Sequence, residues 1–284
     1  MDEFRLIAHH RPSPADTWPE GMRRLRMTVE YDGTAYSGWQ RQKNAASVQE
    51  TLEEAVSALT GEKTGVIGSS RTDAGVHARG LCVHMDTASP IPCVRVPLAL
   101  NAHLPPDIRV RSCQEAVPGF HARYSACAKV YSYRFYNDRQ MCALGRQYRA
   151  HVPVMMDTDR MRASAAALLG THDFAAFAAS GSVAKTTVRT VHALRIDRRG
   201  PEVTLWILGN GFLYNMVRII AGTLQEIGTG KRSGDAFQQA LSRKDRLLLG
   251  QTAPAQGLTL EAVFYEGEEE RLLEFFTQDE IKGR

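Results

Sequence analysis

A short run of residues carries the side chains best suited to chemistry. Arg71, Asp73 and Gly75 alternate with small residues in the sequence R-T-D-A-G-V-H-A. A loop with this spacing can aim the Asp73 carboxylate into a cleft while Arg71 binds an anion, and the glycine permits a tight turn. The alternative is a structural Asx-turn at a strand end, in which Asp73 bonds its own backbone. The run by itself leaves both interpretations open.

The elements that must position this run alternate between strands and helices. Alternating apolar residues predict strands, and 3.6-residue periodicity between capping residues and glycines predicts helices. The expected strands are 25–31, 64–69, 81–85, 129–136, 188–195, 203–208 and 258–265. The expected helices are 48–60, 158–169, 213–227 and 237–241, and 97–104 is ambiguous. Because strands and helices interleave without a strict βαβ repeat, we expect an α+β fold.

Composition indicates an ordinary globular protein. The chain has 284 residues, 43% of them hydrophobic, and no apolar run approaches the roughly 18 residues of a membrane helix. Residues 1–21 contain three prolines and no signal-peptide pattern, so we predict a flexible extension there. The five cysteines form no C-x-x-C pair, which favours reduced thiols and a cytoplasmic protein.

Charge is distributed unevenly along the chain. Residues 266–284 contain seven acidic and three basic residues, whereas the rest of the chain contains 24 acidic and 32 basic residues. A basic body suits a polyanionic partner such as nucleic acid, although ordinary surface charge is the alternative. The acidic tail is either disordered or a terminal helix with Leu272, Leu273, Phe275 and Phe276 as its apolar face.

Motifs for metals and nucleotide cofactors are missing from the sequence. It contains no H-E-x-x-H, no P-loop and no G-x-G-x-x-G. We therefore expect no metal site and no cofactor.

The signature run resembles the catalytic motif of the TruA-type tRNA pseudouridine synthases. Seven further blocks resemble the same family in the same order, so that the resemblance spans about residues 24–265. They lie at 30–42, 101–108, 120–126, 131–137, 168–174, 209–218 and 253–260. One departure is visible, because the family usually has glycine where this chain has Ser70. Serine tolerates a positive φ poorly, so the loop before Arg71 is a place to look for a difference.

The resemblance implies a fold and an activity. The implied fold has two similar ferredoxin-like, RRM-like halves whose mainly antiparallel sheets join around a central cleft. We place these halves at 22–124 and 125–266, between the extension 1–21 and the tail 267–284. The implied reaction converts uridine to pseudouridine at positions 38–40 of the tRNA anticodon arm. It needs no cofactor, and the implied enzyme is a homodimer.

The resemblance also assigns roles to individual residues. Asp73 is the implied catalytic carboxylate, acting as a nucleophile or as a base. Tyr131 would stack on the uracil, and Arg218 would form an ion pair with Asp73. An apolar wall of the uracil pocket is implied for Leu258. The structural alternatives are an Asx-turn for Asp73, a tyrosine packed on the sheet for Tyr131, a surface arginine for Arg218 and core packing for Leu258. Without the resemblance, the structural alternative is favoured for Asp73 and Tyr131. The candidates for RNA contacts are Gln40, Arg41, Arg71, His77, Arg79 and Arg123.

Two other functions remain compatible with the sequence. One is a non-catalytic tRNA-binding protein or folding chaperone on the same scaffold, which the basic body would suit. The other is a nucleoside or base hydrolase, which would release free uracil. The joint presence of Asp73, Tyr131 and Arg218 favours the isomerase.

Overall fold

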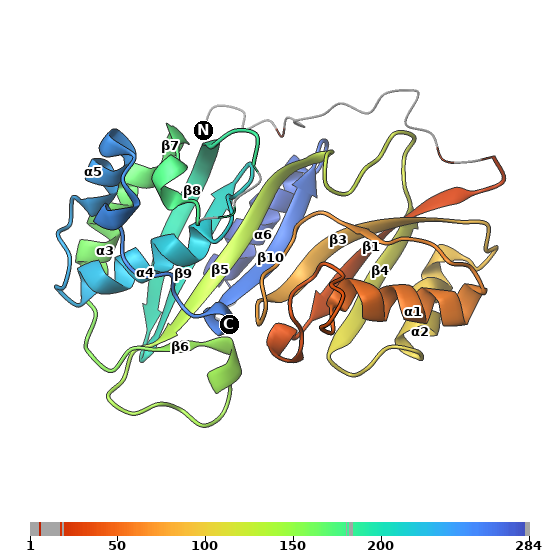
Figure 1. Ribbon diagram of the computed structural model, residues 1–284, viewed down its shortest axis with the longest axis horizontal. Coiled ribbons are helices and arrows are strands. Elements are labelled where there is room, and N and C mark those ends of the chain that lie inside the picture. The colour runs from red at the N-terminus through yellow and green to blue at the C-terminus, as the bar shows by residue number, and fades with distance from the viewer. Residues whose placement is uncertain (1–5, 7–17, 19, 180, 182–183, 282–284) are drawn as a thin grey trace.

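The computed structural model describes residues 6, 18, 20–179, 181 and 184–281, the last six by their backbone only. One large sheet organises it, with the strand order β4-β1-β3-β10-β5-β9-β8-β7 (Figure 1). The first half contains β1 (Arg23–Tyr31), α1 (Val48–Thr60), β2 (Ile67–Gly68), β3 (His77–Thr87), α2 (Val96–Asn101) and β4 (Ile108–Glu115).

The second half begins with β5 (Ala126–Tyr136), β6 (Ala150–His151), α3 (Thr158–Ala165), β7 (Gly170–Asp173), β8 (Val188–Arg199) and β9 (Glu202–Gly209). It ends with α4 (Met216–Gly228), α5 (Ala236–Arg243), β10 (Leu258–Tyr265) and α6 (Glu269–Ile281). In each half the first long strand is central, flanked by β4 and β3 around β1 and by β10 and β9 around β5. The mixed, mostly antiparallel architecture confirms the predicted α+β class. The two similar ferredoxin-like halves and their bounds stay a prediction, and "half" here means only the elements before β5 or from β5 onward.

Alternation along the strands assigns the two faces of the sheet. On β1 the buried residues Leu25, Met27 and Val29 join the main core, whereas the residues between them are only partly buried. Figure 1 shows α1 to α5 on the face over this core, which we call the helical face, and α6 on the opposite back face. On β5 the side chains of Tyr131 and Tyr133 belong to the helical face, because both lie in the main core whereas the preceding Val130 packs in the back-face cluster.

The two halves meet along a short ladder. β3 pairs with β10 in parallel at only two positions, His77 with Thr259 and Ala78 with Leu260. Further along β3, at Val83 and His84, the short strand β2 pairs with it instead. The chain passes from β2 to β3 through residues 69–76, so the signature run lies where the two halves join.

Several predicted elements differ in extent from the structure: the strand expected over 81–85 is the longer β3, the helix expected over 158–169 ends at Ala165, and β4 was not predicted. Two of the differences have a clear local cause. The strand expected over 64–69 shrinks to β2, because side chains of α1 take over the backbone groups of Val66. Glu53 accepts from its N–H, and Gln49 donates to its carbonyl. The helix expected from 213 begins at Met216, because Asn215 adopts a left-handed conformation with φ 60°.

The C-terminal tail forms α6 rather than a disordered segment. Leu272 is buried, and Phe275 packs edge-on against Trp206 and Phe264 on the back face. Leu273 is exposed, so only part of the predicted apolar face is used, and the side chain of Phe276 lies outside the described residues. Most of the predicted extension 1–21 also lies outside them, although the Leu6 amide donates to Glu269.

Acid should weaken the fold through His84. Its Nδ1 accepts a hydrogen bond from the Ala122 amide at 3.1 Å, and burial lowers its pKa to about 3. His84 therefore takes up a proton near pH 6.5 in the unfolded chain but stays neutral at that pH in the folded chain. We predict that this group removes about 2 kcal/mol of unfolding free energy between pH 8 and pH 5, measured by urea denaturation. His84→Gln, which has an acceptor but no titration, should flatten the pH profile, and an unchanged profile would exclude His84 as its source.

Candidate active site

The signature loop is held by the segment that follows β1. The Thr72 carbonyl accepts from the Trp39 amide at 3.1 Å, and the Gly75 amide donates to the Tyr36 carbonyl at 3.2 Å. Beneath the loop, the hydroxyls of Tyr31 and Thr72 lie 2.7 Å apart, with both residues buried. These bonds fix the backbone on both sides of Asp73.

Backbone requirements explain one glycine in this region and the unusual serine. Gly38 has a φ of +98°, and a side chain there would begin 2.5 Å from the Thr72 carbonyl oxygen. Ser70, in contrast, has no positive φ, so the backbone in this chain accommodates serine at the position usually held by glycine. The Ser70 hydroxyl is buried and makes no hydrogen bond of normal geometry to a described atom.

The Asp73 carboxylate points across the junction between the halves. Its Oδ2 accepts from Nη1 of Arg218 at 3.0 Å, and the two side chains keep 25% and 17% of their surface exposed. The Val76 amide donates to the Asp73 main-chain carbonyl at 3.1 Å, which closes the turn without the carboxylate. The carboxylate is thus directed at Arg218, as the resemblance implies.

Arg218 is itself fixed by two further acceptors. It lies in the first turn of α4, where its Nε donates to the Ala253 carbonyl at 2.9 Å. Its Nη1 also donates to Oδ1 of Asn215 at 2.9 Å. The Ala253 amide in turn donates to the Arg218 carbonyl at 3.0 Å. The guanidinium therefore has little freedom to leave Asp73.

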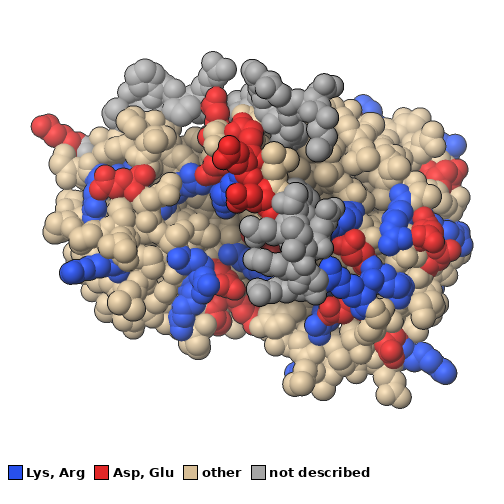
Figure 2. Space-filling view, turned by 180° about the vertical axis from the view of Figure 1, so that it is seen from behind, with Lys and Arg blue, Asp and Glu red and all other residues tan. Residues whose placement is uncertain are grey.

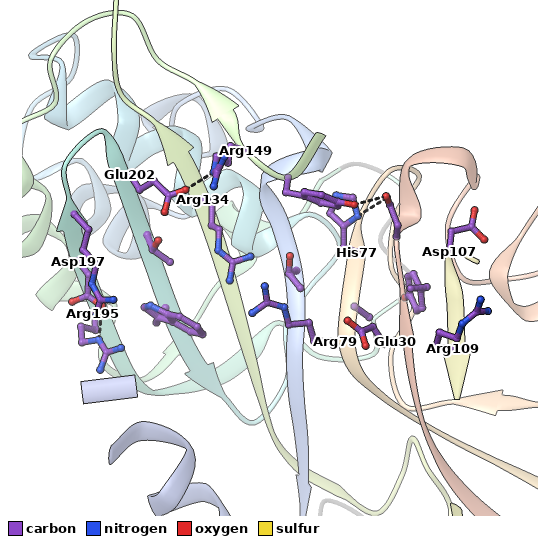
Figure 3. A pocket seen from close by; sticks show the side chains of 18 of the residues that line it. Glu30, His77, Arg79, Asp107, Arg109, Arg134, Arg149, Arg195, Asp197 and Glu202 are labelled. Atoms are coloured by element: carbon purple, nitrogen blue, oxygen red, sulfur yellow. Dashed lines mark hydrogen bonds and ion pairs between the residues drawn. The ribbon is translucent and has the colours of Figure 1, made fainter. Parts of the chain in front are cut away.

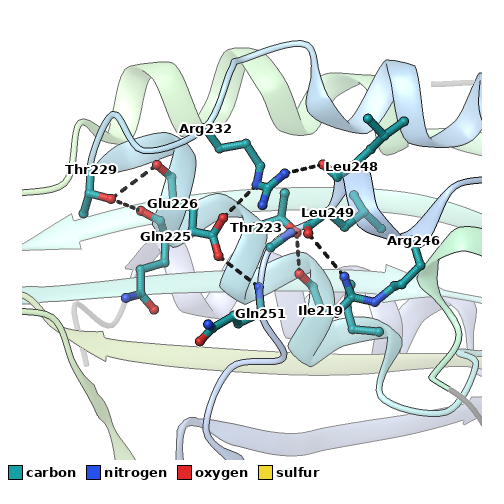
Figure 4. A network of polar contacts seen from close by, with 11 residues as sticks. Ile219, Thr223, Gln225, Glu226, Thr229, Arg232, Arg246, Leu248, Leu249 and Gln251 are labelled. Carbon is teal, nitrogen blue, oxygen red and sulfur yellow. Dashed lines mark hydrogen bonds and ion pairs between the residues drawn. The ribbon is translucent and has the colours of Figure 1, made fainter.

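A second network fixes the segment that precedes Ala253 (Figure 4). Glu226 of α4 accepts from Arg232 at 2.7 Å and from the Gln251 amide at 2.9 Å. Thr223, one turn earlier, accepts from the Gly250 amide. Because this segment is tied to the middle of α4, the Ala253 carbonyl is held at the distance that Arg218 requires.

Tyr131 lies near this pair on the helical face. The Phe212 ring packs edge-on against it, with the ring centres 5.3 Å apart. Burial raises the pKa of the Tyr131 hydroxyl to about 12, the Asp73 charge adds to this rise, and Ser70 opposes it. The phenol is therefore neutral at physiological pH. Leu258, also buried, lies opposite Tyr133 in the β10–β5 ladder.

The predicted RNA-contact residues fall into two groups. Gln40, Arg41, Arg71 and Arg123 are all exposed, although Arg41 donates to Glu53 at 2.6 Å. His77 and Arg79 instead line a cavity of about 940 Å³ whose lining runs over the ends of the strands and onto the back face (Figure 3). The lining of this cavity includes none of Asp73, Tyr131 and Arg218.

The bonds of His77 and Arg79 indicate structural roles. Nδ1 of His77 accepts from the Gly33 amide at 3.0 Å, and Nε2 lies 3.0 Å from the Gln147 carbonyl. Burial lowers the His77 pKa, which suits a neutral ring that joins two loops. Arg79 pairs with the buried Glu261 at 3.5 Å on the back face. Figure 2 shows acidic and basic side chains interspersed over that face.

Asn215 belongs to the site through its bond to Arg218, a role that was not predicted from the sequence. The sequence did contain a signal for a left-handed residue at Asn215, because asparagine is among the few residues that tolerate this backbone conformation. Within the described residues there is no cluster of three or more side chains suited to hold a metal ion. In the same part of the chain, no helix is long and apolar enough to cross a membrane.

Comparisons with known proteins give the family of this chain. The family model for tRNA pseudouridine synthase matches residues 27–125 and 164–266. A tRNA pseudouridine synthase A of Acetivibrio thermocellus is 49% identical over 244 residues, covering 86% of this chain and all of that protein. The synthase A of Clostridium kluyveri is 46% identical with the same coverage.

One solved structure, that of a Cbf5-Nop10-Gar1 complex, overlaps 99% of this chain and 69% of its own, with a TM-score of 0.37 and 12% identity. This structural similarity is too low to support any conclusion about the chain. The sequence matches are sufficient: the chain belongs to the tRNA pseudouridine synthase family. It is an isomerase that converts uridine to pseudouridine in tRNA.

Asn215 provides a test of how tightly Arg218 must be held. Asn215→Gly keeps the left-handed backbone but removes the acceptor of Arg218, so we predict a five- to tenfold lower single-turnover rate, equivalent to about 1 kcal/mol. Asn215→Ala should show the same loss and unfold more easily by about 1 kcal/mol, because alanine is strained at this φ. A full rate for Asn215→Gly would show that the Arg218 contact positions nothing.

Proposed function

We propose that the protein isomerises uridine at positions 38–40 of the tRNA anticodon arm, with Asp73 acting on the nucleotide and no cofactor taking part. The observation that carries this proposal is the convergence of three side chains from distant parts of the chain. Asp73 comes from the loop before β3, Tyr131 from β5 and Arg218 from α4. All three occupy the helical face at the junction of the two halves.

The reaction needs a carboxylate and no external electrons. The bond between C1′ of the ribose and N1 of uracil breaks, the base turns, and C1′ bonds to C5. The C5 proton is lost, and N1 becomes protonated. Asp73 would act on the sugar as a nucleophile or as a base. Arg218 orients its carboxylate and balances its charge.

Tyr131 suits an extruded base. Its ring can stack on uracil, and its neutral hydroxyl can donate or accept a hydrogen bond at the base edge. Extruding a base from a stem costs a few kcal/mol, which contacts with the protein must offset. The detached base must also be shielded from water, because hydrolysis would leave an abasic site. Phe212 and Leu258 supply apolar surface near this tyrosine and on the adjoining strand.

The proposal is tested by tritium release from tRNA transcripts that carry C5-tritiated uridine. We expect release by the wild type and a rate about 10²- to 10⁴-fold lower for Asp73→Asn, which keeps the shape of the side chain. Transcripts with uridine at only one of positions 38, 39 and 40 should each release tritium, and a transcript without these uridines should not.

Three results would contradict parts of this proposal. Equal release by Asp73→Asn would remove Asp73 from the chemistry. Release from the transcript that lacks the three uridines would exclude the anticodon-arm specificity. Binding without any release by the wild type would leave a non-catalytic tRNA-binding protein.

We further propose a homodimer that acts in the cytoplasm, where tRNA is modified. Sedimentation of the purified chain, with and without tRNA, measures the subunit count. A monomer that releases tritium at the full rate would exclude a need for the dimer.

A further inference from the structure

Lys129 is a cation without an acidic partner beside the proposed site. It precedes Tyr131 by two residues on β5, so both side chains lie on the helical face. Its Nζ donates to the Ser69 carbonyl at 2.7 Å, at the start of the signature loop. Among the described residues no carboxylate pairs with it, and this bond leaves two of its three protons for other acceptors.

Arg189 provides a second such cation on the same face. Lys129 lies opposite Gly209 in the β5–β9 ladder, and Gly209 lies opposite Val191 in the β9–β8 ladder. Val191 belongs to the core of the helical face, and Arg189 precedes it by two residues on β8. Arg189 therefore lies diagonally across Gly209 from Lys129, two residues along β8 from the position directly opposite, and its charge acts on Lys129.

The turn between these cations contains two glycines. It runs from Gly209 to Gly211, and Nε of Arg189 lies 3.7 Å from where a Cβ of Gly211 would be. The Asn210 side chain is occupied, because its Oδ1 accepts from the Thr190 amide. Gly209 is buried, and a Cβ there would lie 2.8 Å from the Thr190 carbonyl oxygen. At Gly211 a Cβ would meet only the Arg189 side chain within 4 Å, so Gly211 is the part of the turn that another backbone can approach closely. The next residue, Phe212, packs on Tyr131, which joins the turn to the proposed site.

The charges of this region are uncompensated. The guanidinium of Arg189 donates only to the carbonyls of Thr186 and Val188 in the described contacts. Burial, together with repulsion from Arg123 and Arg189, lowers the pKa of Lys129 to about 8. Like charges gathered in a partly enclosed place are unfavourable until an anion joins them.

We propose that Lys129 and Arg189 bind a phosphodiester of the RNA strand that flanks the target uridine, as the strand passes over the turn Gly209–Gly211. The exposed Arg123, whose charge also acts on Lys129, belongs to the same subsite. The inference rests on the proposed function, because it names how that substrate is held. Contacts of this kind position the RNA without reading its sequence.

The test measures the salt dependence of tRNA affinity for Lys129→Met and Arg189→Gln. Loss of one phosphate contact should lower the slope of log K against log salt by about 0.7 to 0.9. Arg111→Gln is the matched control, because it removes one charge from an exposed arginine of β4 that pairs with Glu30 at 3.4 Å. We expect the control to keep the wild-type slope and all variants to keep their cooperative unfolding.

The proposal is overturned if both variants keep the wild-type slope, or if Arg111→Gln lowers it as much as they do. Should Lys129→Met fail to fold, the comparison of Arg189→Gln with Arg111→Gln decides alone. The activity of Asp73→Asn, measured in parallel, distinguishes failure of the phosphate subsite from failure of the proposed reaction. Inactive Asp73→Asn with unchanged slopes removes only the subsite, whereas active Asp73→Asn removes the proposed chemistry.

The pH dependence gives an independent readout. The groups that face Lys129 are the Ser69 carbonyl, Arg123 and Arg189, and no carboxylate is among them. Wild-type affinity should therefore fall between pH 7 and pH 9, as Lys129 loses its charge through a pKa of about 8. Lys129→Arg keeps its charge over this range, so its affinity should not follow. Parallel profiles for the two proteins would contradict the assignment.

Discussion

The ion pair between Asp73 and Arg218 forms only when both halves of the chain are folded and in contact. Its partners are 145 residues apart and belong to different halves, so neither half can form it alone. Both side chains are largely removed from water, and loss of one would leave the other as an uncompensated charge. Most of the polar network around α4 can be understood from this constraint, because Asn215, Ala253 and the Glu226 network hold Arg218 before it meets Asp73.

The two faces of the sheet differ in what their polar side chains do. On the helical face, Asp73, Tyr131 and Arg218 surround the junction. On the back face, the buried Glu261 of β10 accepts from Ser132 and Arg134 of β5, which locks these two strands together. The bonds of His77 and the ion pair of Arg79 with Glu261 belong to this structural side, although His77 lies within the signature run and Arg79 directly follows it. Proximity along the chain was therefore a poor guide to chemistry here, since neighbours on a strand point to opposite faces.

Strong local patterns made much of the fold predictable. The helix from Val48 is capped by Ser47 and ends at the left-handed Gly61, and the strand 258–265 has the predicted bounds. One error arose where distant side chains replaced ladder bonds, as Glu53 and Gln49 do around Val66, and another where the left-handed backbone of Asn215 delays the start of α4. The site was predictable through its motifs, but Lys129 was overlooked although a period of two from Tyr131 would have revealed it. The support of Arg218 by Ala253 could not be read from sequence, because it depends on tertiary packing.

The position of β10 in the sheet has a consequence for folding of the nascent chain. It is the last strand of the chain, yet it lies in the middle of the sheet, between β3 and β5. A ribosome has therefore made both halves before it makes the strand that joins them, and long-range pairings of this kind form slowly. Until residues 258–265 emerge, β3 and β5 each present an unpaired edge. The nascent chain thus cannot close the sheet between β3 and β5 until residues 258–265 have been made, and these two strand edges are exposed to aggregation until then.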